Sequence, residues 1–115
     1  MARDPSCIFC RIVAGEIPSR KAYEDDDILV FHDIAPWAPV HVLVIPEHHV
    51  ETFREIERFE AAEAKRMLEF VAETAKRVGL TDYRVVVNVG PGGGQTIYHL
   101  HWHVLGGSTM AEGTM

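Results

Sequence analysis

The densest group of reactive side chains is the sequence HLHWHVL at residues 99–105. Alternate residues of a β-strand share a face, so a strand here would present His99, His101 and His103 on one side. The apolar residues between them would point into the core. Imidazole serves as a nucleophile, a base or a metal ligand. Three imidazoles in register therefore predict a functional site, in preference to a half-exposed strand whose polar face happens to be histidine.

A glycine-rich segment, GPGGG at residues 90–94, stands before the histidines and is followed by Gln95 and Thr96. Glycine lets the backbone approach a phosphate, and successive N–H groups in such turns bind anions. The segment lacks the Lys-Ser/Thr pair of a P-loop and opens no helix. An ordinary surface turn is the alternative, but the position directly before the histidines favours phosphate binding.

Two cysteines, Cys7 and Cys10, are three residues apart in a predicted helix and face the same side. They could form a redox pair, half of a zinc site, or two small buried apolar groups. A thioredoxin-like motif should follow a strand, and residue 7 leaves no room for one. For tetrahedral zinc, His48, His49 and the histidines of 99–103 are the candidates for the other ligands.

The sequence Phe31-His32-Asp33-Ile34 ends a predicted strand ahead of a loop with two prolines. A carboxylate at a strand end suits the two hydroxyls of a ribose, and phenylalanine and isoleucine suit a flat base. An aspartate that merely makes a turn is an equally good interpretation of Asp33. His41 is expected to be structural or simply exposed.

Hydrophobic periodicity predicts the elements that position these groups. A first helix has its N-cap at Asp4, with Pro5 as its first residue, continues to Val13 and ends at Gly15. A second spans 55–78, with an apolar stripe at Ala64, Met67, Leu68, Val71, Ala75 and Val78. Strands are expected at 21–24, 28–32, 41–45, 83–89 and 99–105. The fold class is therefore α+β: an antiparallel five-stranded sheet with two helices.

Composition excludes several classes of protein. The 115 residues are 47% apolar and 24% charged, which argues against disorder across the chain. The net charge of −6 argues against binding of nucleic acid, because proteins that bind the phosphate backbone are normally basic. No apolar run reaches the roughly 18 residues that span a membrane, and no signal segment is recognised at the start, so a cytoplasmic location is expected. We expect one domain over 1–115, with a core of about 6–107 and a mobile tail at 108–115.

With these motifs in place, the chain resembles the histidine triad superfamily, whose motif is His-φ-His-φ-His-φ-φ with φ apolar. The resemblance covers about residues 6–107 and is nearest to the histidine triad nucleotide-binding, purine nucleoside phosphoramidase-like branch. The matching segments, in family order, are Ile8-Phe9, Gly15–Pro18, Glu24-Asp25, Phe31–Pro36, Ala38-Pro39, Val44–Pro46, Asn88, Gly93–Thr96 and Gly106-Gly107. Thr96 departs from the serine common in that branch. The Gln-Thr pair is frequent in dinucleoside polyphosphate hydrolases.

The resemblance implies a hydrolase that cleaves nucleoside 5′-phosphoramidates at the α-phosphate through a nucleotidyl-histidine. His101 would be the nucleophile, with His103, Gln95 and Thr96 acting on the phosphate and the leaving group. Dinucleoside polyphosphate hydrolysis and a non-catalytic nucleotide-binding module with structural zinc are the alternatives. The implied nucleotide-binding residues are Phe9, Phe31, His32, Asp33, Ile34, Asn88, Gly93, Gly94, Gln95, Thr96, Ile97, His101 and His103.

The resemblance also implies a structural, non-catalytic Zn²⁺ on Cys7, Cys10, His49 and His99, as in many bacterial members. The expected partners are purine nucleotides of the AMP or GMP type, with no nucleic acid and no membrane. A homodimer is implied along the 55–78 helix and the adjoining strand.

Overall fold

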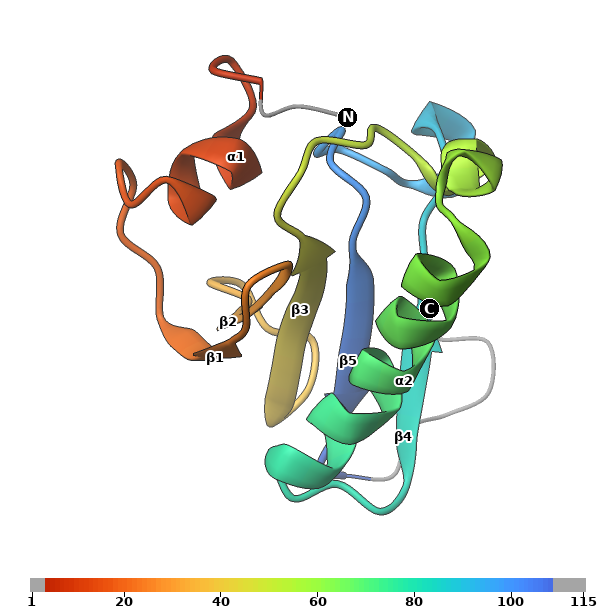
Figure 1. Ribbon diagram of the computed structural model, residues 1–115. Helices are drawn as coiled ribbons and strands as arrows, with labels where there is room; N and C mark the ends of the chain where they lie inside the picture. The colour runs from red at the N-terminus through yellow and green to blue at the C-terminus, as the bar shows by residue number, and fades with distance from the viewer. Residues whose placement is uncertain (1–3, 109–115) are drawn as a thin grey trace.

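The computed structural model describes residues 4–108. Five strands form one antiparallel sheet in the order β1-β2-β3-β5-β4 (Figure 1). The strands are β1 (Lys21–Glu24), β2 (Ile28–His32), β3 (Val40–Pro46), β4 (Tyr83–Val86) and β5 (Trp102–Gly106). Two α-helices, α1 (Ile8–Val13) and α2 (Ala61–Arg77), complete the predicted α+β fold, which is confirmed. Two 3₁₀ helices, η1 (Phe53–Arg58) and η2 (Pro91–Gly93), lie in the connections.

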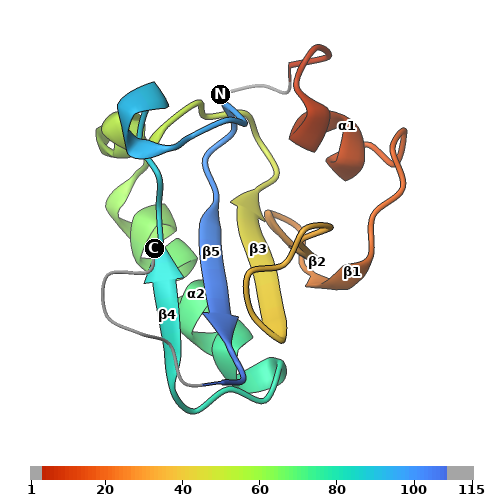
Figure 2. The same cartoon turned by 180° about the vertical axis from the view of Figure 1, so that it is seen from behind.

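The sheet is buried on both faces because its central strands are apolar at consecutive positions. On β2, Ile28 and Val30 belong to the cluster under α2, whereas Leu29 and Phe31 belong to the cluster that includes α1. Figures 1 and 2 show α2 crossing one face of the sheet and α1 beside its β2–β3 side. The histidines of residues 99–105 therefore lie in a partly closed environment, and not on an open polar face.

The first helix begins later than predicted. Asp4 is not its N-cap, because the Asp4 side chain accepts from the backbone N–H and the hydroxyl of Ser6 and forms a turn. The helix starts at Ile8, with Cys7 as the N-cap and its sulfur 3.4 Å from the N–H of Cys10. It ends before Gly15, whose φ of +80° favours glycine.

The predicted 55–78 helix is two elements. The backbone of Glu55 leaves helical geometry within η1, and α2 starts only at Ala61. Met67, Val71 and Ala75 are buried as expected, but Leu68 is 58% exposed, so it lies off the buried stripe.

Two strands are shorter than predicted. β4 ends at Val86 instead of Val89, and β5 begins at Trp102 instead of His99. The N–H of Leu100 donates to the carbonyl of Val50 in the connection after β3, so this part of the chain is not paired in the sheet. Of the predicted tail, residues 109–115 lie outside the described residues.

Candidate active site and metal centre

His101 is held as a neutral imidazole with one nitrogen free. Its Nδ1 lies 2.7 Å from the carbonyl oxygen of His99. A carbonyl only accepts hydrogen bonds, so Nδ1 carries the proton and Nε2 keeps its lone pair. His101 is 8% exposed, and burial lowers the pKa of its imidazole. The ring of Phe9 packs edge-on against it, with centroids 5.3 Å apart. This state suits nucleophilic attack through Nε2.

His103 follows two residues later and pairs with His41 of the neighbouring strand. The Nε2 atom of His41 and the Nδ1 atom of His103 are 2.9 Å apart. Burial, together with the nearby His101 and His41, lowers the pKa of His103 to about 4. His103 is therefore neutral at pH 7, and its second nitrogen is available to a ligand.

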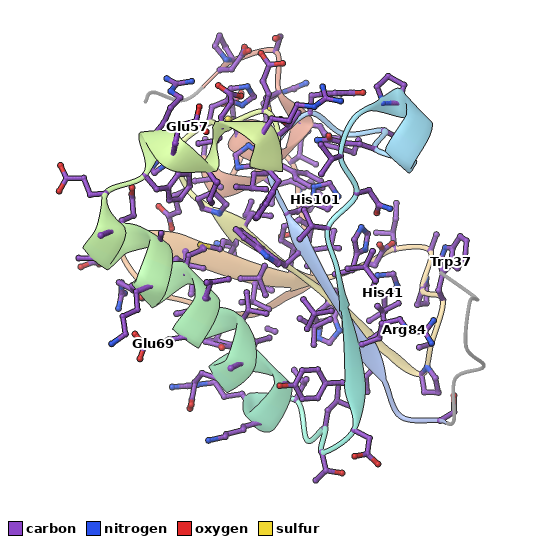
Figure 3. All side chains as sticks on the ribbon, turned by 90° about the vertical axis from the view of Figure 1, so that its right-hand side faces the viewer. Trp37, His41, Glu57, Glu69, Arg84 and His101 are labelled. Atoms are coloured by element: carbon purple, nitrogen blue, oxygen red, sulfur yellow. The ribbon has the colours of Figure 1, made fainter. Side chains whose placement is uncertain are left out.

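The direction of the hydrogen bond between these two rings is set by the loop before β3. The backbone N–H of Trp37 donates to Nδ1 of His41 at 3.0 Å, and the two residues lie close together (Figure 3). Because Nδ1 of neutral His41 is an acceptor, its Nε2 carries the proton and donates to His103. The remaining proton of His103 is then on Nε2. Burial lowers the pKa of His41, which favours the neutral ring.

His41 is the residue whose role the sequence analysis missed. It is 3% exposed, so the expectation of an exposed side chain was wrong and a structural role was the better alternative. In β3, His41 lies on the same face as Leu43, which pairs directly with His103. Diagonal neighbours across antiparallel strands are within reach of long side chains. The sequence does place His41 at even spacing from Leu43 and Ile45, which indicates one shared face of the strand. Only the register of β3 against β5 shows that this face brings His41 to His103.

The two carboxylate oxygens of Asp33 have different surroundings. Its Oδ1 accepts from the N–H of Ala35 at 2.8 Å, which is the turn-forming role. Its Oδ2 lies 3.5 Å from Nε2 of His41, so the carboxylate also faces the paired histidines. One carboxylate oxygen therefore stabilises the loop, and the other is directed toward the site.

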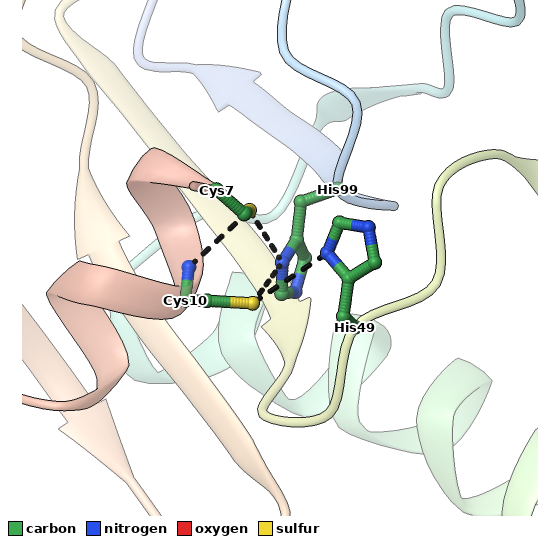
Figure 4. A group of neighbouring side chains, drawn as sticks. All are labelled: Cys7, Cys10, His49 and His99. Carbon is green, nitrogen blue, oxygen red and sulfur yellow. Dashed lines mark hydrogen bonds between the residues drawn. The ribbon is translucent and has the colours of Figure 1, made fainter. Parts of the chain in front are cut away.

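Cys7, Cys10, His49 and His99 converge as the family resemblance implied (Figure 4). Their ligating atoms all lie within 4.8 Å of one another. Nδ1 of His99 is 3.3 Å from the sulfur of Cys7 and 3.5 Å from that of Cys10. Nδ1 of His49 is 3.5 Å from the sulfur of Cys10. Two sulfurs and two imidazole nitrogens are a donor set that suits tetrahedral zinc.

The surroundings of this cluster also suit a metal ion. Nε2 of His99 lies 2.7 Å from the carbonyl of Pro46, so Nε2 holds the proton and Nδ1 presents its lone pair to the sulfurs. A metal-bound histidine ordinarily donates its other N–H in this way. Burial raises the pKa of Cys10 to about 11 and lowers that of His99 to about 4. A divalent cation would favour the thiolate that burial disfavours.

Asp33, His41 and His103 form a second group with metal-ligand spacing. Hydrogen bonding argues against a metal there. A neutral histidine that ligates through Nε2 carries its proton on Nδ1, but Nδ1 of His41 already accepts from Trp37. The hydrogen bond of His99 leaves a nitrogen lone pair for a metal, whereas that of His41 does not. The group of Asp33, His41 and His103 is therefore better described as a chain of hydrogen bonds.

The glycine-rich segment is held by two amide side chains. Asn88 donates to the carbonyl of Gly93 at 2.9 Å. Gln95 accepts from the N–H of Gly90 and donates to the carbonyls of Glu51 and Ile97. Both amide hydrogens of Gln95 are thus used by backbone groups. Through these hydrogen bonds, Gln95 joins the glycine-rich segment to the connection after β3.

The remaining residues expected at a nucleotide site differ in exposure. Phe9 and Phe31 are buried and contact each other edge-on, with ring centroids 5.3 Å apart. Ile34 is fully exposed. Thr96 is exposed, whereas His32 and Ile97 are half-buried. Burial, with a smaller contribution from Arg20, lowers the pKa of His32.

The described residues contain no helix long and apolar enough to cross a membrane.

Comparisons with known proteins agree with this geometry. Residues 14–110 match the family model described as the HIT domain. An uncharacterised HIT-like protein of Synechococcus elongatus is 48% identical over 105 residues, which are 90% of this chain and 92% of that protein.

Two solved structures are similar in sequence and fold. A HIT family hydrolase from Legionella pneumophila is 41% identical with a TM-score of 0.88, over 94% of this chain and 98% of that one. A zinc-bound histidine triad family protein from Mycobacterium smegmatis is 29% identical with a TM-score of 0.74, over 95% of this chain and 78% of that one. The sequence, the fold and the paired histidines lead to one conclusion: the chain belongs to the HIT, or histidine triad, family.

Proposed function

We propose that this protein is a nucleotidyl hydrolase that cleaves purine nucleoside 5′-phosphoramidates at the α-phosphorus. The observation that carries the proposal is the complementary state of two neighbouring histidines: His101 directly before β5 and His103 within it, with ring centroids 5.0 Å apart. His101 keeps a free lone pair on Nε2, and His103 keeps a proton on Nε2. A nucleophile next to a hydrogen-bond donor suits attack on a phosphate. The likeness to the HIT family hydrolase of Legionella pneumophila supports hydrolysis.

The proposed reaction has two displacements at phosphorus. Nε2 of His101 attacks, the P–N bond to the amine breaks, and the amine leaves after taking one proton from solvent. Water then attacks the nucleotidyl-histidine, the bond to Nε2 breaks, and one proton returns to solvent as the nucleoside monophosphate leaves. His103 donates its Nε2–H to a phosphate oxygen as negative charge develops there. Exposed Thr96 and the backbone of Gly93 and Gly94 contact the same phosphate.

The nucleoside is proposed to lie beside Asp33, which accepts from the ribose hydroxyls through the oxygen that faces His41. Buried Phe9 and Phe31 support the base from below, and exposed Ile34 covers it. The other residues proposed to line this site are His32, Asn88 and Ile97.

The decisive experiment looks for the covalent intermediate. Wild-type protein, mixed with adenosine 5′-phosphoramidate and quenched in acid, should give a peptide with one adenylyl group on His101 by mass spectrometry. His101→Ala should bind AMP with nearly unchanged affinity and lose nearly all turnover. An adduct on another residue, or full turnover by His101→Ala, contradicts the mechanism.

Dinucleoside polyphosphate hydrolysis is the second candidate, and Thr96 is the residue that favours it. Both substrates would form the same adenylyl-histidine, so the intermediate alone does not separate them. Comparing kcat/KM for adenosine 5′-phosphoramidate and diadenosine tetraphosphate does separate them. Failure of both substrates, with AMP still bound, would leave a non-catalytic nucleotide-binding module.

We further propose that Cys7, Cys10, His49 and His99 hold a structural Zn²⁺. Four protein ligands leave no open position, so the ion would stabilise structure and take no part in the reaction. The zinc bound to the histidine triad protein of Mycobacterium smegmatis supports this choice of ion. Zinc-bound or free thiols suit the cytoplasmic location expected from the sequence.

A homodimer is also proposed. Among residues 4–108, β4 is an edge strand of the sheet, next to β5. Tyr83 and Val85 on β4 are 42% and 44% exposed, and Leu68 on α2 is 58% exposed. Exposed apolar side chains on neighbouring elements fit contact with a second copy along α2 and β4.

A further inference from the structure

The helix that carries two of the metal ligands also carries a residue of the nucleotide site. Cys7 caps α1, Cys10 lies within it, and Phe9 lies between them. The Phe9 ring contacts His101 edge-on at 5.3 Å and His99 at 5.9 Å. Any force that fixes Cys7 and Cys10 in place therefore also fixes Phe9 against the nucleophile.

A second connection between the two sites runs through His99. Its ring faces the sulfurs of Cys7 and Cys10, and its carbonyl oxygen accepts the Nδ1–H of His101 at 2.7 Å. The hydrogen bond from Nε2 of His99 to Pro46 fixes the ring on its far side. The same residue is thus a metal ligand through its side chain and the positioning group of the nucleophile through its backbone.

The length of α1 makes these connections consequential. A helix of six residues is not stable by itself in water, because too few hydrogen bonds repay its nucleation. α1 depends on tertiary contacts: Phe9 and Ile12 in the apolar cluster, and Cys7 and Cys10 at the metal centre. Bound metal would therefore reduce the entropy that a nucleotide has to remove when it orders Phe9 and His101.

We propose that the metal centre and the nucleotide site are thermodynamically coupled through α1 and His99. This inference rests on the proposed function and adds a regulatory property to it: zinc raises the affinity for AMP, and AMP raises the affinity for zinc by the same factor. Couplings of this kind are typically about 5- to 150-fold. Chelation or competition for zinc would thus lower nucleotide binding and turnover without any metal ion touching the substrate.

The test measures binding in both directions. Calorimetry gives the Kd of AMP for zinc-loaded and metal-depleted protein, and competition with a chromophoric chelator gives the Kd of zinc with and without saturating AMP. We expect both ratios to be at least about fivefold and equal. Equal AMP affinity in both metal states would refute the coupling and leave the proposed function intact. Absence of AMP binding in both states would remove the proposed function and the coupling together.

Metal depletion could unfold the chain, so a second arm keeps the site filled. Co²⁺ in place of zinc gives visible absorption bands that report its coordination. Saturating AMP should raise the affinity for Co²⁺, followed in these bands as a chelator removes the ion from wild-type protein, and an affinity that AMP leaves unchanged contradicts the coupling.

Two variants locate the pathway. Phe9→Leu keeps all four ligands and should reduce the ratio of AMP affinities between the two metal states. The control, Asp33→Asn, should weaken AMP binding in both metal states by the same factor and leave that ratio unchanged. A Phe9→Leu ratio equal to that of wild type would overturn the pathway through α1, and a Phe9→Leu protein with an unchanged Co²⁺ response would do the same.

Discussion

Nε2 of His41 donates to Nδ1 of His103 across 2.9 Å. Because Nδ1 of His103 accepts this hydrogen bond, the proton of neutral His103 is on Nε2. The direction comes from the backbone N–H of Trp37, which is an obligatory donor. A loop amide thus sets the tautomer of a side chain two hydrogen bonds away. Neutral His103 would otherwise divide its proton between two nitrogens.

The first prediction tests His41 as a positioning residue. His41→Ala removes the donor to His103, so His103 should populate both tautomers. We expect kcat for adenosine 5′-phosphoramidate to fall about tenfold or more, with KM changed much less, because the lost donor acts mainly on developing charge. The measurement is steady-state kinetics.

A merely structural role for His41 is separated by ¹⁵N NMR. In wild-type protein the His103 signals should report a proton on Nε2, and in His41→Ala they should report a mixture. Reduced turnover with an unchanged His103 tautomer would contradict this account.

A second prediction concerns Asp33 and the ribose. Loss of a hydrogen bond to a charged group costs about 1.5–3 kcal/mol, or roughly ten- to a hundredfold in affinity. Asp33→Ala should weaken the binding of AMP by that factor, and the binding of a 2′,3′-dideoxy analogue much less. Calorimetry on both ligands measures it.

The structure supplies a sharper control for this experiment. Asp33→Asn keeps an oxygen that can accept from Ala35, so it preserves the turn while removing the charge. If Asp33→Ala weakens both ligands equally while Asp33→Asn weakens neither, then Asp33 holds the loop and does not bind the ribose.

The third prediction concerns the metal. Protein purified without chelator should hold one zinc per chain, with X-ray absorption showing two sulfurs at about 2.3 Å and two nitrogens at about 2.0–2.1 Å. His49→Asn should lose zinc, whereas the adjacent His48→Asn should keep it, because His48 instead packs on Phe59 near Glu63. Zinc at 1,000 times its Kd stabilises a fold by about 4 kcal/mol. A metal-free protein with the same Tm as the loaded one would count against a structural role.

Much of this arrangement follows from sequence because it depends on local pattern. β1 and β2 have the predicted bounds, 21–24 and 28–32, and β3 exceeds its prediction by one residue at each end. The ligand set of the metal centre was available only through the family resemblance. Spacing alone left His48 and His49 equivalent.

Most features that sequence did not show depend on long-range pairing, and one depends on a local side-chain hydrogen bond. His41 acquires its role from the register of β3 against β5, which no local pattern encodes. The start of α1 moved because the Asp4 side chain bonds to Ser6 in a turn, an alternative open to any N-cap residue. The hydrogen bond from the Gln95 amide to the carbonyl of Glu51 likewise joins residues that are far apart in the sequence.

A fourth prediction follows from the pKa of His103, which burial and the nearby His101 and His41 lower to about 4 while Asp33 opposes the shift. An unfolded histidine titrates near 6.5. Between these values the unfolded chain binds more protons than the folded one, so the free energy of unfolding falls as pH drops from 6.5 toward 4.

Urea unfolding of the protein at several pH values measures this slope. His103→Gln should show a shallower dependence between pH 6.5 and 4 than wild type, and the two proteins should have parallel profiles above pH 7. Parallel profiles throughout would mean that the folded His103 titrates like a free imidazole.

The last prediction tests the proposed dimer at a position that the core does not need. Leu68 is 58% exposed on α2, so replacing it should not disturb the packing under that helix. Leu68→Glu would place a charge in an apolar contact, where an unpaired charge is costly. Light scattering should show wild type at twice the chain mass and Leu68→Glu shifted toward one chain mass, with an unchanged circular dichroism spectrum.

Lys21→Gln makes the same change of one charge unit on β1, at the opposite edge of the sheet, and should stay dimeric. A wild-type protein that runs as one chain, or a Leu68→Glu protein that stays dimeric, would place this face in solvent and not in an interface.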